Sequence, residues 1–328
     1  MAAMAQHFLL SKAARSLSLV QVARLSDDAA WETFKAIRWE ATEGQPFCPR
    51  CGCLKHSFIA TRKLFKCAGC RHQYSVTSGT IFASRKLPIR DHLLAIAIFA
   101  NGAKGHSALQ LSRDLNVQYR TAFVMAHKLR EAVAAETAEA TLSGTVEVDG
   151  AYFGGHVRPE NRKEDRRDRR LAENQTGKRR VVVVIRERNG KALTFAFRSE
   201  AESVETIEAR VLPGSVVHAD EAKGWDRLHK SFTTHRINHQ ESYSDGEACT
   251  NQAESYFARL RRSEMGVHHR IAGPYLAAYA REMAWRENYR RVSNGGQYAV
   301  IAGAALTHAP SQVWRGYWQR HQPVKGAA

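Results

Sequence analysis

Apolar residues change their spacing along the chain, and the change separates a helical part from a strand-rich part. Between 87 and 133 they recur at helical spacing, and Ser107 as a helix cap and a turn at Asn116 and Val117 mark off two shorter helices. After 143, short runs rich in β-branched residues predict strands. We expect strands at 145–152, 180–188, 192–198 and 216–219, and helices at 203–212 and 251–262.

The order of these elements predicts the fold of the second half of the chain. Three antiparallel strands, a helix and a strand parallel to the first are the order expected of an RNase H-like α/β/α core. Asp149 lies within the first strand, and Asp220 lies at the end of the fourth, which would be its neighbour. Glu254 lies at the border of the apolar face of the last helix. We therefore expect the three carboxylates to meet at one edge of the sheet.

Carboxylates grouped on a basic chain indicate metal-dependent chemistry on a polyanion. The chain has 49 Lys and Arg against 32 Asp and Glu and a pI near 9.9, which predicts attraction to polyphosphate. Hard oxygen ligands such as Asp149, Asp220 and Glu254 can hold two magnesium ions, which activate the attacking oxygen and stabilise the leaving oxygen in phosphodiester cleavage. A single Asp at a strand end is more often a turn residue, so the prediction depends on the order of all three.

Two cysteine pairs near the N-terminus predict a zinc ribbon. Cys48 and Cys51 form one C-x-x-C pair, and Cys67 and Cys70 form the other, with fifteen residues between the pairs. Four thiolates suit one tetrahedral, structural zinc ion. Cys53 is an alternative ligand to Cys51, but C-x-C spacing suits such a turn less well, so we expect Cys53 not to bind the ion. The alternative for the whole cluster is a redox pair.

The helical part at 86–134 has a helix-turn-helix pattern. Its second short helix leaves a polar and basic set of side chains outward, which suits the major groove of DNA. This set consists of Gln118, Tyr119, Arg120, Thr121 and Lys128. The alternative is a small helical bundle whose outer face is only solvated. A zinc ribbon next to these helices on a basic chain favours DNA binding, although ribbons equally bind proteins.

Neither a membrane span nor a secretion signal is indicated. No apolar run approaches the roughly 18 residues that a span needs. The first 25 residues are basic and lack acidic side chains, which also suits an organellar transit peptide, but they contain no apolar segment followed by a cleavage motif. We expect a cytoplasmic protein whose partner is double-stranded DNA.

Several separate segments resemble bacterial insertion-sequence transposases of the DDE type that have an N-terminal zinc ribbon. The segments are RW in AIRWEA, the two cysteine pairs, SVTSGTIFASRKLPI, EVDGAYFGG, HADEAKGW, and TNQAESYFARLRR followed by HHRIAGPYL. The resemblance covers most of the chain, from about Ser26 to about Arg291. The resemblance implies a nucleoid-associated bacterial enzyme that uses magnesium or manganese, recognises terminal inverted repeats, nicks the element ends and joins the freed 3′ hydroxyls to target DNA. It implies Asp149, Asp220 and Glu254 as the catalytic acids, and a homo-oligomer on DNA.

The resemblance also implies roles for residues around the acids. In similar proteins a basic residue one or two helical turns after the catalytic Glu contacts DNA, and Arg261 has that place here. His239 resembles a recurring polar residue near the site and is expected to be auxiliary. Cys249 stands where many relatives have His, and this departure puts an auxiliary role at that position in doubt.

A highly charged insertion separates the first two strands, at 156–180. It resembles a basic insertion of the same group, and it is expected to clamp DNA close to the metals. The residues that would do so are Arg166, Arg167, Arg169 and Arg170. The alternative is a solvated loop, because runs of charge are common on protein surfaces.

The sequence thus predicts a multidomain α/β protein. We expect an N-terminal helical segment at 1–45, the ribbon at 46–78, the helix-turn-helix segment at 86–134, the catalytic domain at 143–291 and a tail at 292–328. Trp314, Tyr317 and Trp318 in the tail favour packing or an assembly contact. Two other functions stay open beside a transposase: a zinc-ribbon DNA-binding regulator with an inactive RNase H-like domain, and a metal-dependent nuclease without strand transfer.

Overall fold

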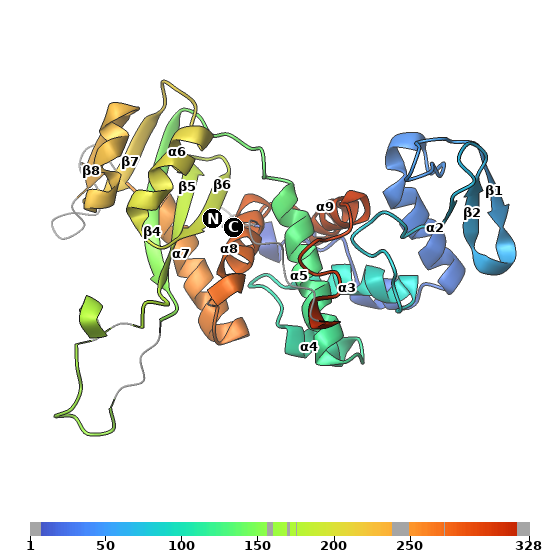
Figure 1. Cartoon of the computed structure of the whole chain (residues 1–328), viewed down its shortest axis with the longest axis horizontal. Helices are drawn as coiled ribbons and strands as arrows, with labels where there is room; N and C mark the ends of the chain where they lie inside the picture. The colour runs from blue at the N-terminus through green and yellow to red at the C-terminus, as the bar shows by residue number, and fades with distance from the viewer. Residues whose placement is uncertain are drawn as a thin grey trace, which may run out of the picture. The chain divides into compact units, whose positions relative to one another are not determined.

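The chain divides into two compact units. The computed structural model describes residues 8–155, 160–168, 171–174, 176–237, 249–271 and 273–319. Unit 2 is the continuous stretch Thr137–Asn288, and unit 1 combines Met1–Glu136 with Tyr289–Ala328 (Figure 1). Across the described part of the chain, no helix has both the length and the apolar character needed to cross a bilayer.

A five-stranded mixed sheet forms the centre of unit 2. Its order is β6-β5-β4-β7-β8, with β4, β5 and β6 antiparallel neighbours and β7 and β8 parallel to β4. The bounds are β4 Thr145–Phe153, β5 Arg180–Glu187, β6 Ala192–Phe197, β7 Val216–Asp220 and β8 Thr233–Ile237. The four strands expected from the sequence are present with the expected pairing. Strand β8 was not expected, because only its last residue is fully buried and its apolar pattern is weak.

Helices cover both faces of this sheet, which gives three α/β/α layers (Figure 1). Side chains alternate between the two faces along each strand, so β4 and β5 contribute to two separate apolar cores. One core joins the sheet to α6 and the 3₁₀ helix η6, and the other joins it to α7 and α8. The bounds are α6 Val204–Arg210, η6 Lys223–Lys230, α7 Asn251–Ser263 and α8 Leu276–Asn288.

Unit 1 combines a small three-stranded sheet with helices. The antiparallel sheet has the order β1-β2-β3, and Phe58 pairs with Phe65 in the hairpin between the two cysteine pairs. Its strands are β1 His56–Ile59, β2 Leu64–Cys67 and β3 Gln73–Tyr74. Its helices include α1 Leu19–Ala23, α2 Asp27–Arg38, α3 Ile89–Asn101, α4 Ala108–Asp114, α5 Tyr119–Ala135 and α9 Asn294–Thr307.

Helices α3, α4 and α5 follow the expected pattern. The Ser107 hydroxyl accepts a hydrogen bond from the Gln110 N–H at 3.1 Å and so caps α4. Asn116 has a φ of 51°, a left-handed conformation that turns the chain between α4 and α5. Ile98, Leu111, Ala122 and Ala126 form a buried cluster that packs the three helices together.

The C-terminal residues return to unit 1 and form a helix, where we had expected a tail. Helix α9 packs against α2, α3 and α5. Beyond it, Trp314 stacks on His127 with 4.3 Å between ring centroids and meets Phe123 edge-on at 5.9 Å. The Ser311 hydroxyl donates to the Glu131 carboxylate at 2.6 Å. The aromatic group at the C-terminus is therefore used for packing inside unit 1.

Candidate active site and zinc centre

Asp149 and Asp220 occupy adjacent positions on neighbouring parallel strands. The register of β4 and β7 pairs Val148 with Ala219, so the next position on each strand carries one of the two aspartates. Val148 and Ala219 point into the core beneath α6. Because side chains alternate, Asp149 lies on the opposite face, which α7 covers, and Asp220 ends the neighbouring strand, about 4.8 Å away.

Glu254 comes to the same face from helix α7. This helix packs on β4 and β5 through Ala253, Tyr256, Phe257 and Leu260, all of which are buried. Glu254 lies in the first turn of α7 at the border of that buried face and is itself half-buried. The fold therefore brings the three acids named from the sequence into one region of unit 2.

The carboxylates influence one another strongly. Burial, the charge of Asp220, and smaller effects of Glu254 and Glu200 raise the pKa of Asp149 from 3.8 to about 7. The Gly150 N–H, which donates to Asp149 Oδ1 at 2.7 Å, opposes this shift. Among the described residues, no set of three carboxylates has oxygens that all lie within 4.8 Å of one another. A divalent cation between them would remove the repulsion, and hard oxygen donors are the ligands that Mg²⁺ and Mn²⁺ prefer.

A buried tryptophan fixes the orientation of Asp220. The indole Nε1–H of Trp225 donates to Asp220 Oδ1 at 2.5 Å, and the Ala222 N–H donates to the same oxygen at 3.2 Å. Arg236, on β8, donates from Nε to the Asp220 carbonyl at 2.7 Å and from Nη2 to the Ala222 carbonyl at 2.7 Å. The unexpected strand β8 thus supports the loop that follows Asp220.

A fourth carboxylate, Glu200, lies near the acids and was not expected from the sequence. A methyl group on Gly150 would lie 3.2 Å from Glu200 Oε1, and one on Gly224 would lie 2.8 Å from Glu200 Cβ. Burial and the charge of Asp220 raise the pKa of Glu200, and Arg179 lowers it. Two glycines therefore leave the space that Glu200 fills. The signal in the sequence is weak, because Glu200 belongs to a turn, SEAES, that reads as ordinary acidic surface.

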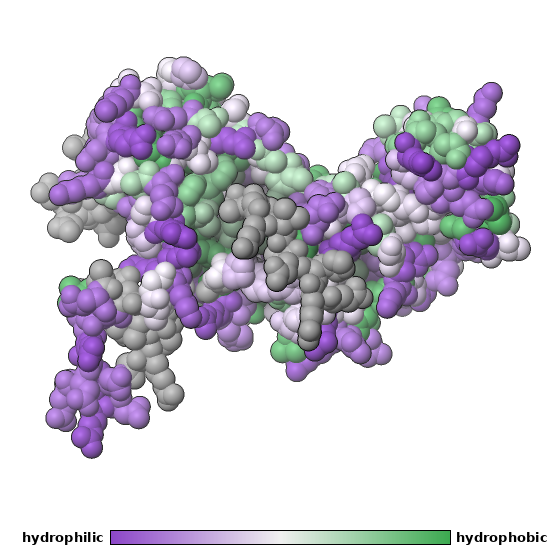
Figure 2. Space-filling view, viewed as in Figure 1, coloured by the Kyte–Doolittle hydropathy of each residue, from purple (hydrophilic) through white to green (hydrophobic). Residues whose placement is uncertain are grey.

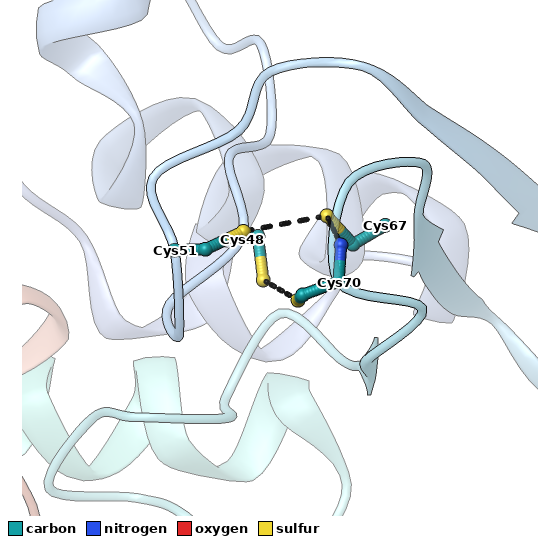
Figure 3. Close-up of side chains that lie close together, drawn as sticks. All are labelled: Cys48, Cys51, Cys67 and Cys70. Carbon is teal, nitrogen blue, oxygen red and sulfur yellow. Dashed lines mark hydrogen bonds between the residues drawn. The ribbon is translucent and has the colours of Figure 1, made fainter.

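The four predicted cysteines form a compact sulfur cluster in unit 1. The ligand atoms of Cys48, Cys51, Cys67 and Cys70 all lie within 4.8 Å of one another, and Figure 3 shows the side chains converging. The Cys48–Cys70 and Cys51–Cys67 sulfur distances are both 3.6 Å. A tetrahedral zinc ion with Zn–S bonds of about 2.3 Å needs sulfurs about 3.8 Å apart, so the cluster fits one structural zinc ion. Cys53 lies outside the cluster, as expected.

An arginine and two tryptophans hold the ribbon together. Arg38 of α2 donates from Nη1 to the Ser75 carbonyl at 3.0 Å, and it also donates to the carbonyls of Val76 and Ser78. Trp39, fully buried, meets Phe65 edge-on at 5.6 Å, and Trp31 stacks on the same ring at 5.9 Å. The RW pair of AIRWEA therefore joins α2 to the ribbon and to the segment that follows it.

Comparison with known families decides the identity of both parts. Residues 141–288 match the ISXO2-like transposase domain, and residues 25–73 match the transposase zinc-ribbon domain. Together the two matches cover more than half of the chain. The chain belongs to the insertion-sequence transposases of the DDE type with an N-terminal zinc ribbon. No curated protein matches it significantly.

In this transposase, most of the residues expected to face DNA on α5 are exposed. Gln118, Tyr119 and Arg120 lie exposed at the start of the helix, and Arg120 lies over the Trp318 ring at 5.3 Å. Lys128 differs from the expectation, because it is half-buried and burial lowers its pKa. Lys128 lies more than two turns further along the helix than the exposed set, where α5 packs against its neighbours.

A basic hollow lies where β4 ends and β5 begins. It has a volume of about 710 Å³ and is lined by Tyr152, Gly177, Arg179, Arg180 and Arg198. The Arg179 guanidinium lies over the Tyr152 ring at 4.3 Å. Arg179 also acts on Glu200, which links the hollow electrostatically to the acids. The hollow was not expected from the sequence, because its residues come from three separate segments.

The remaining expected residues are placed only in part. Arg166 and Arg167 are exposed, and Figure 2 shows strongly hydrophilic residues along the described part of the insertion. Arg261 is exposed near the end of α7, about two turns beyond Glu254. Arg169, Arg170 and His239 lie outside the described residues.

Proposed function

We propose that the chain is an active transposase that nicks the ends of its element and joins the freed 3′ hydroxyls to target DNA. The observation that carries this proposal is the placement of Asp149 and Asp220 at adjacent positions of neighbouring strands, with Glu254 on the helix that packs on the sheet; burial and the neighbouring acids also raise the pKa of Asp149 to about 7. A structural acid is normally ionised through contact with a cation or several N–H donors, whereas here several carboxylates crowd together on a protein with a net charge of +17. Such crowding is suited to metal binding.

Asp149, Asp220 and Glu254 are the residues that would hold two divalent ions, magnesium or manganese. Bound there, the ions would polarise the attacking oxygen and stabilise the leaving 3′ oxygen of a phosphodiester. The Trp225 indole keeps the Asp220 carboxylate in one orientation, so that its other oxygen, Oδ2, can face the site. Glu200 adds negative charge beside the same acids.

DNA would be bound by separate basic surfaces of the two units. In unit 2 the hollow lined by Arg179, Arg180 and Arg198 offers guanidinium groups that suit phosphate, and Arg261 lies exposed on the helix of Glu254. In unit 1 the exposed start of α5, with Gln118, Tyr119 and Arg120, is suited to reading the terminal inverted repeats in the major groove. Arg166, Arg167, Arg169 and Arg170 of the insertion would clamp DNA near the metals.

The proposed role of the zinc ion is structural. Its four thiolates leave no position open for a substrate, which is typical of a structural site. We further propose that the protein works in the bacterial cytoplasm at the nucleoid. It would act there as a homo-oligomer, since two element ends have to be held together.

Strand cleavage and joining on defined DNA test this function. The substrates are labelled duplexes taken from the DNA that flanks the coding sequence, incubated with Mg²⁺ and supercoiled plasmid as the target. The unmodified protein should nick the duplex at one position and produce joined products. Asp149→Asn, Asp220→Asn and Glu254→Gln should each abolish both reactions while DNA binding stays within about twofold, because removal of a ligand disables metal-dependent chemistry without changing the basic surface.

The other outcomes of this experiment identify the alternatives. DNA binding without nicking by the unmodified protein would indicate a regulator with an inactive catalytic domain. Nicking without joined products, also from duplexes with a free 3′ hydroxyl at the cleaved end, would indicate a nuclease. Activity that survives all three substitutions would overturn the assignment of the acids.

A further inference from the structure

Glu147, two residues before Asp149 on β4, caps the helix that carries Glu254. Its carboxylate is fully buried on the face of the sheet that α7 covers. Glu147 Oε2 accepts hydrogen bonds from the Gln252 N–H at 2.8 Å and from the Ala253 N–H at 3.1 Å. These are the second and third residues of α7, whose N–H groups have no partner inside the helix.

The usual capping residue does not perform this task. Thr250 is the N-cap residue of α7, and its side chain makes no capping hydrogen bond. A serine, threonine or aspartate at the N-cap normally accepts from the second or third N–H of its own helix. Here an acid from another element takes that place. The cap therefore connects β4 with α7, whereas an ordinary cap would stabilise only the helix itself.

Arg188 completes the connection on the other oxygen. Its Nε donates to Glu147 Oε1 at 3.0 Å, and its Nη2 donates to the Cys249 carbonyl at 3.2 Å and to Cys249 Sγ at 2.8 Å. The Arg188 N–H also donates to the Thr145 carbonyl at 2.9 Å, which fixes the arginine to β4. Cys249, which directly precedes the N-cap residue of α7, thus accepts from Arg188. Both sides of the start of α7 are held from the sheet.

Gln252 adds a third connection between the first turn of α7 and the end of β5. Its side-chain Oε1 accepts from Arg186 Nε at 3.1 Å and from the Asn189 N–H at 3.3 Å. Glu254 follows two residues later, and its own N–H donates to the Thr250 carbonyl at 2.9 Å. The place of Glu254 relative to the sheet is therefore determined by a short, rigid set of contacts.

We propose that Glu147 is a positioning residue, which sets the distance between Asp149 and Glu254 by capping α7 from the strand that carries Asp149. This inference rests on the proposed function, because it concerns the same three acids. Glu147 is directed into the start of the helix and is not among the residues that would hold the metals. Its charge is balanced by Arg188 and by the positive end of the helix.

The substitution Glu147→Gln tests this role with little change in shape. If the amide oxygen takes the place of Oε2, it still accepts from both N–H groups of α7 but the NH₂ group faces Arg188; in the reverse orientation the NH₂ group faces both N–H groups. In either orientation one side of the connection is lost. We expect the start of α7 to loosen and Glu254 to lose its fixed place. Outer partners that orient metal ligands typically change metal affinity about 10- to 100-fold when they are removed, and we expect a loss of that order.

Three measurements on the full chain follow this change. Hydrogen–deuterium exchange should speed up at the Gln252 and Ala253 amides. Titration with Mn²⁺ alone, followed by its electron paramagnetic resonance signal, should show weaker binding by the factor above, while DNA affinity stays within about twofold because the basic surface is unchanged. Glu282→Gln is the matched control, since Glu282 is a buried acid of unit 2 that forms an ion pair with Arg286 on its own helix. It should lower the melting temperature without changing Mn²⁺ affinity.

The outcomes separate this inference from the proposed function. If Glu147→Gln binds Mn²⁺ like the unmodified protein and only melts earlier, as the control does, Glu147 is merely structural and the inference is wrong. If the unmodified protein shows no Mn²⁺ binding that depends on Asp149 and Glu254, the proposed function fails instead. Should Glu147→Gln not fold, Arg188→Gln decides: weaker Mn²⁺ binding supports the positioning role, and unchanged binding contradicts it.

Discussion

The indole nitrogen of Trp225 lies 2.5 Å from Oδ1 of Asp220, and this contact joins the end of β7 to the 3₁₀ helix that follows it. Trp225 is fully buried, so its ring cannot move without disturbing the core beneath α6. The contact restricts the carboxylate of Asp220 to one orientation. The contact explains why Asp220 and Trp225 are spaced as they are along the HADEAKGW sequence.

Replacement of Trp225 by Phe is expected to lower the rate of DNA cleavage even in the fraction of molecules that is folded. Phenylalanine keeps most of the buried ring but lacks the N–H, so one charged hydrogen bond is lost at a cost of about 1–3 kcal/mol. Asp220 would then be held only by the Ala222 N–H, and this looser orientation should lower the cleavage rate about tenfold, as for other partners that orient metal ligands. Trp285→Phe, a change in another buried tryptophan of unit 2, should lower the melting temperature and leave the rate per folded molecule unchanged. Equal rate losses in both variants would contradict the role of the N–H.

The raised pKa of Asp149 predicts that the metal-free protein becomes less stable as the pH rises. The folded pKa is about 7 and the ordinary value is 3.8, so the folded state holds this proton more tightly than the unfolded state. The resulting stability is complete below about pH 4 and is lost as the pH rises through about 7, and it amounts to at most a few kcal/mol. Thermal unfolding in EDTA at pH 5.5 and pH 8 measures it. The Asp149→Asn variant should show a smaller difference between the two pH values, and Mg²⁺ should restore stability mainly at pH 8.

The sulfur cluster predicts one zinc ion per chain with a defined ligand set. Cys67→Ser should lose the ion, because Cys67 is buried and its sulfur is within the cluster. Cys53→Ser should keep it, because Cys53 Sγ instead donates to the Lys55 carbonyl at 3.7 Å. Zinc content of the purified variants, measured by elemental analysis, distinguishes the two. Loss of zinc from Cys53→Ser would mean that Cys53 replaces Cys51 as a ligand.

A methyl group at Gly224 is expected to displace Glu200. Its Cβ would lie 2.8 Å from Glu200 Cβ and 3.1 Å from the Ala201 nitrogen, so the turn before α6 has to move. Overpacking of this kind costs about 1–3 kcal/mol. Gly266→Ala is a suitable control, since a methyl group there meets no atom within 4 Å. Denaturant unfolding should show a lower free energy of unfolding for Gly224→Ala alone, and an unchanged value would mean that Glu200 moves without cost.

Features that follow from local pattern were predictable. The β-branched runs fixed the strands, and the parallel pairing of β4 with β7 was expected from the order of elements, so Asp149 and Asp220 were expected to be neighbours. The phase of α7 placed Glu254 at the border of the buried face, because helical spacing depends on neighbouring residues alone. The two C-x-x-C pairs predicted the sulfur cluster, because the spacing within each pair is also a local feature of the sequence.

Features that depend on contacts between distant segments were not predictable. Glu147 looks like any polar residue in a strand until the start of α7, about a hundred residues later, is placed against it. Glu200 is close to the acids only because Gly150 and Gly224 leave room from two other elements. Helix α9 has small residues, such as Ala302 and Ala305, on its buried side, so its buried and exposed faces differ little in hydrophobicity along the sequence. Lys128 was expected to face the solvent, but neighbouring segments cover more of α5 than the spacing of its apolar residues indicates.

The return of the chain to unit 1 has a consequence for the order in which the protein is made. A ribosome synthesises all of unit 2, with its three acids, before it reaches Asn294, where α9 begins. Domains generally fold as units from the N-terminus onward, yet here the unit that begins the chain is the last to receive its full sequence. A chain that stops at Asn288 would carry Asp149, Asp220 and Glu254 but leave α2, α3 and α5 without the helix that packs on them.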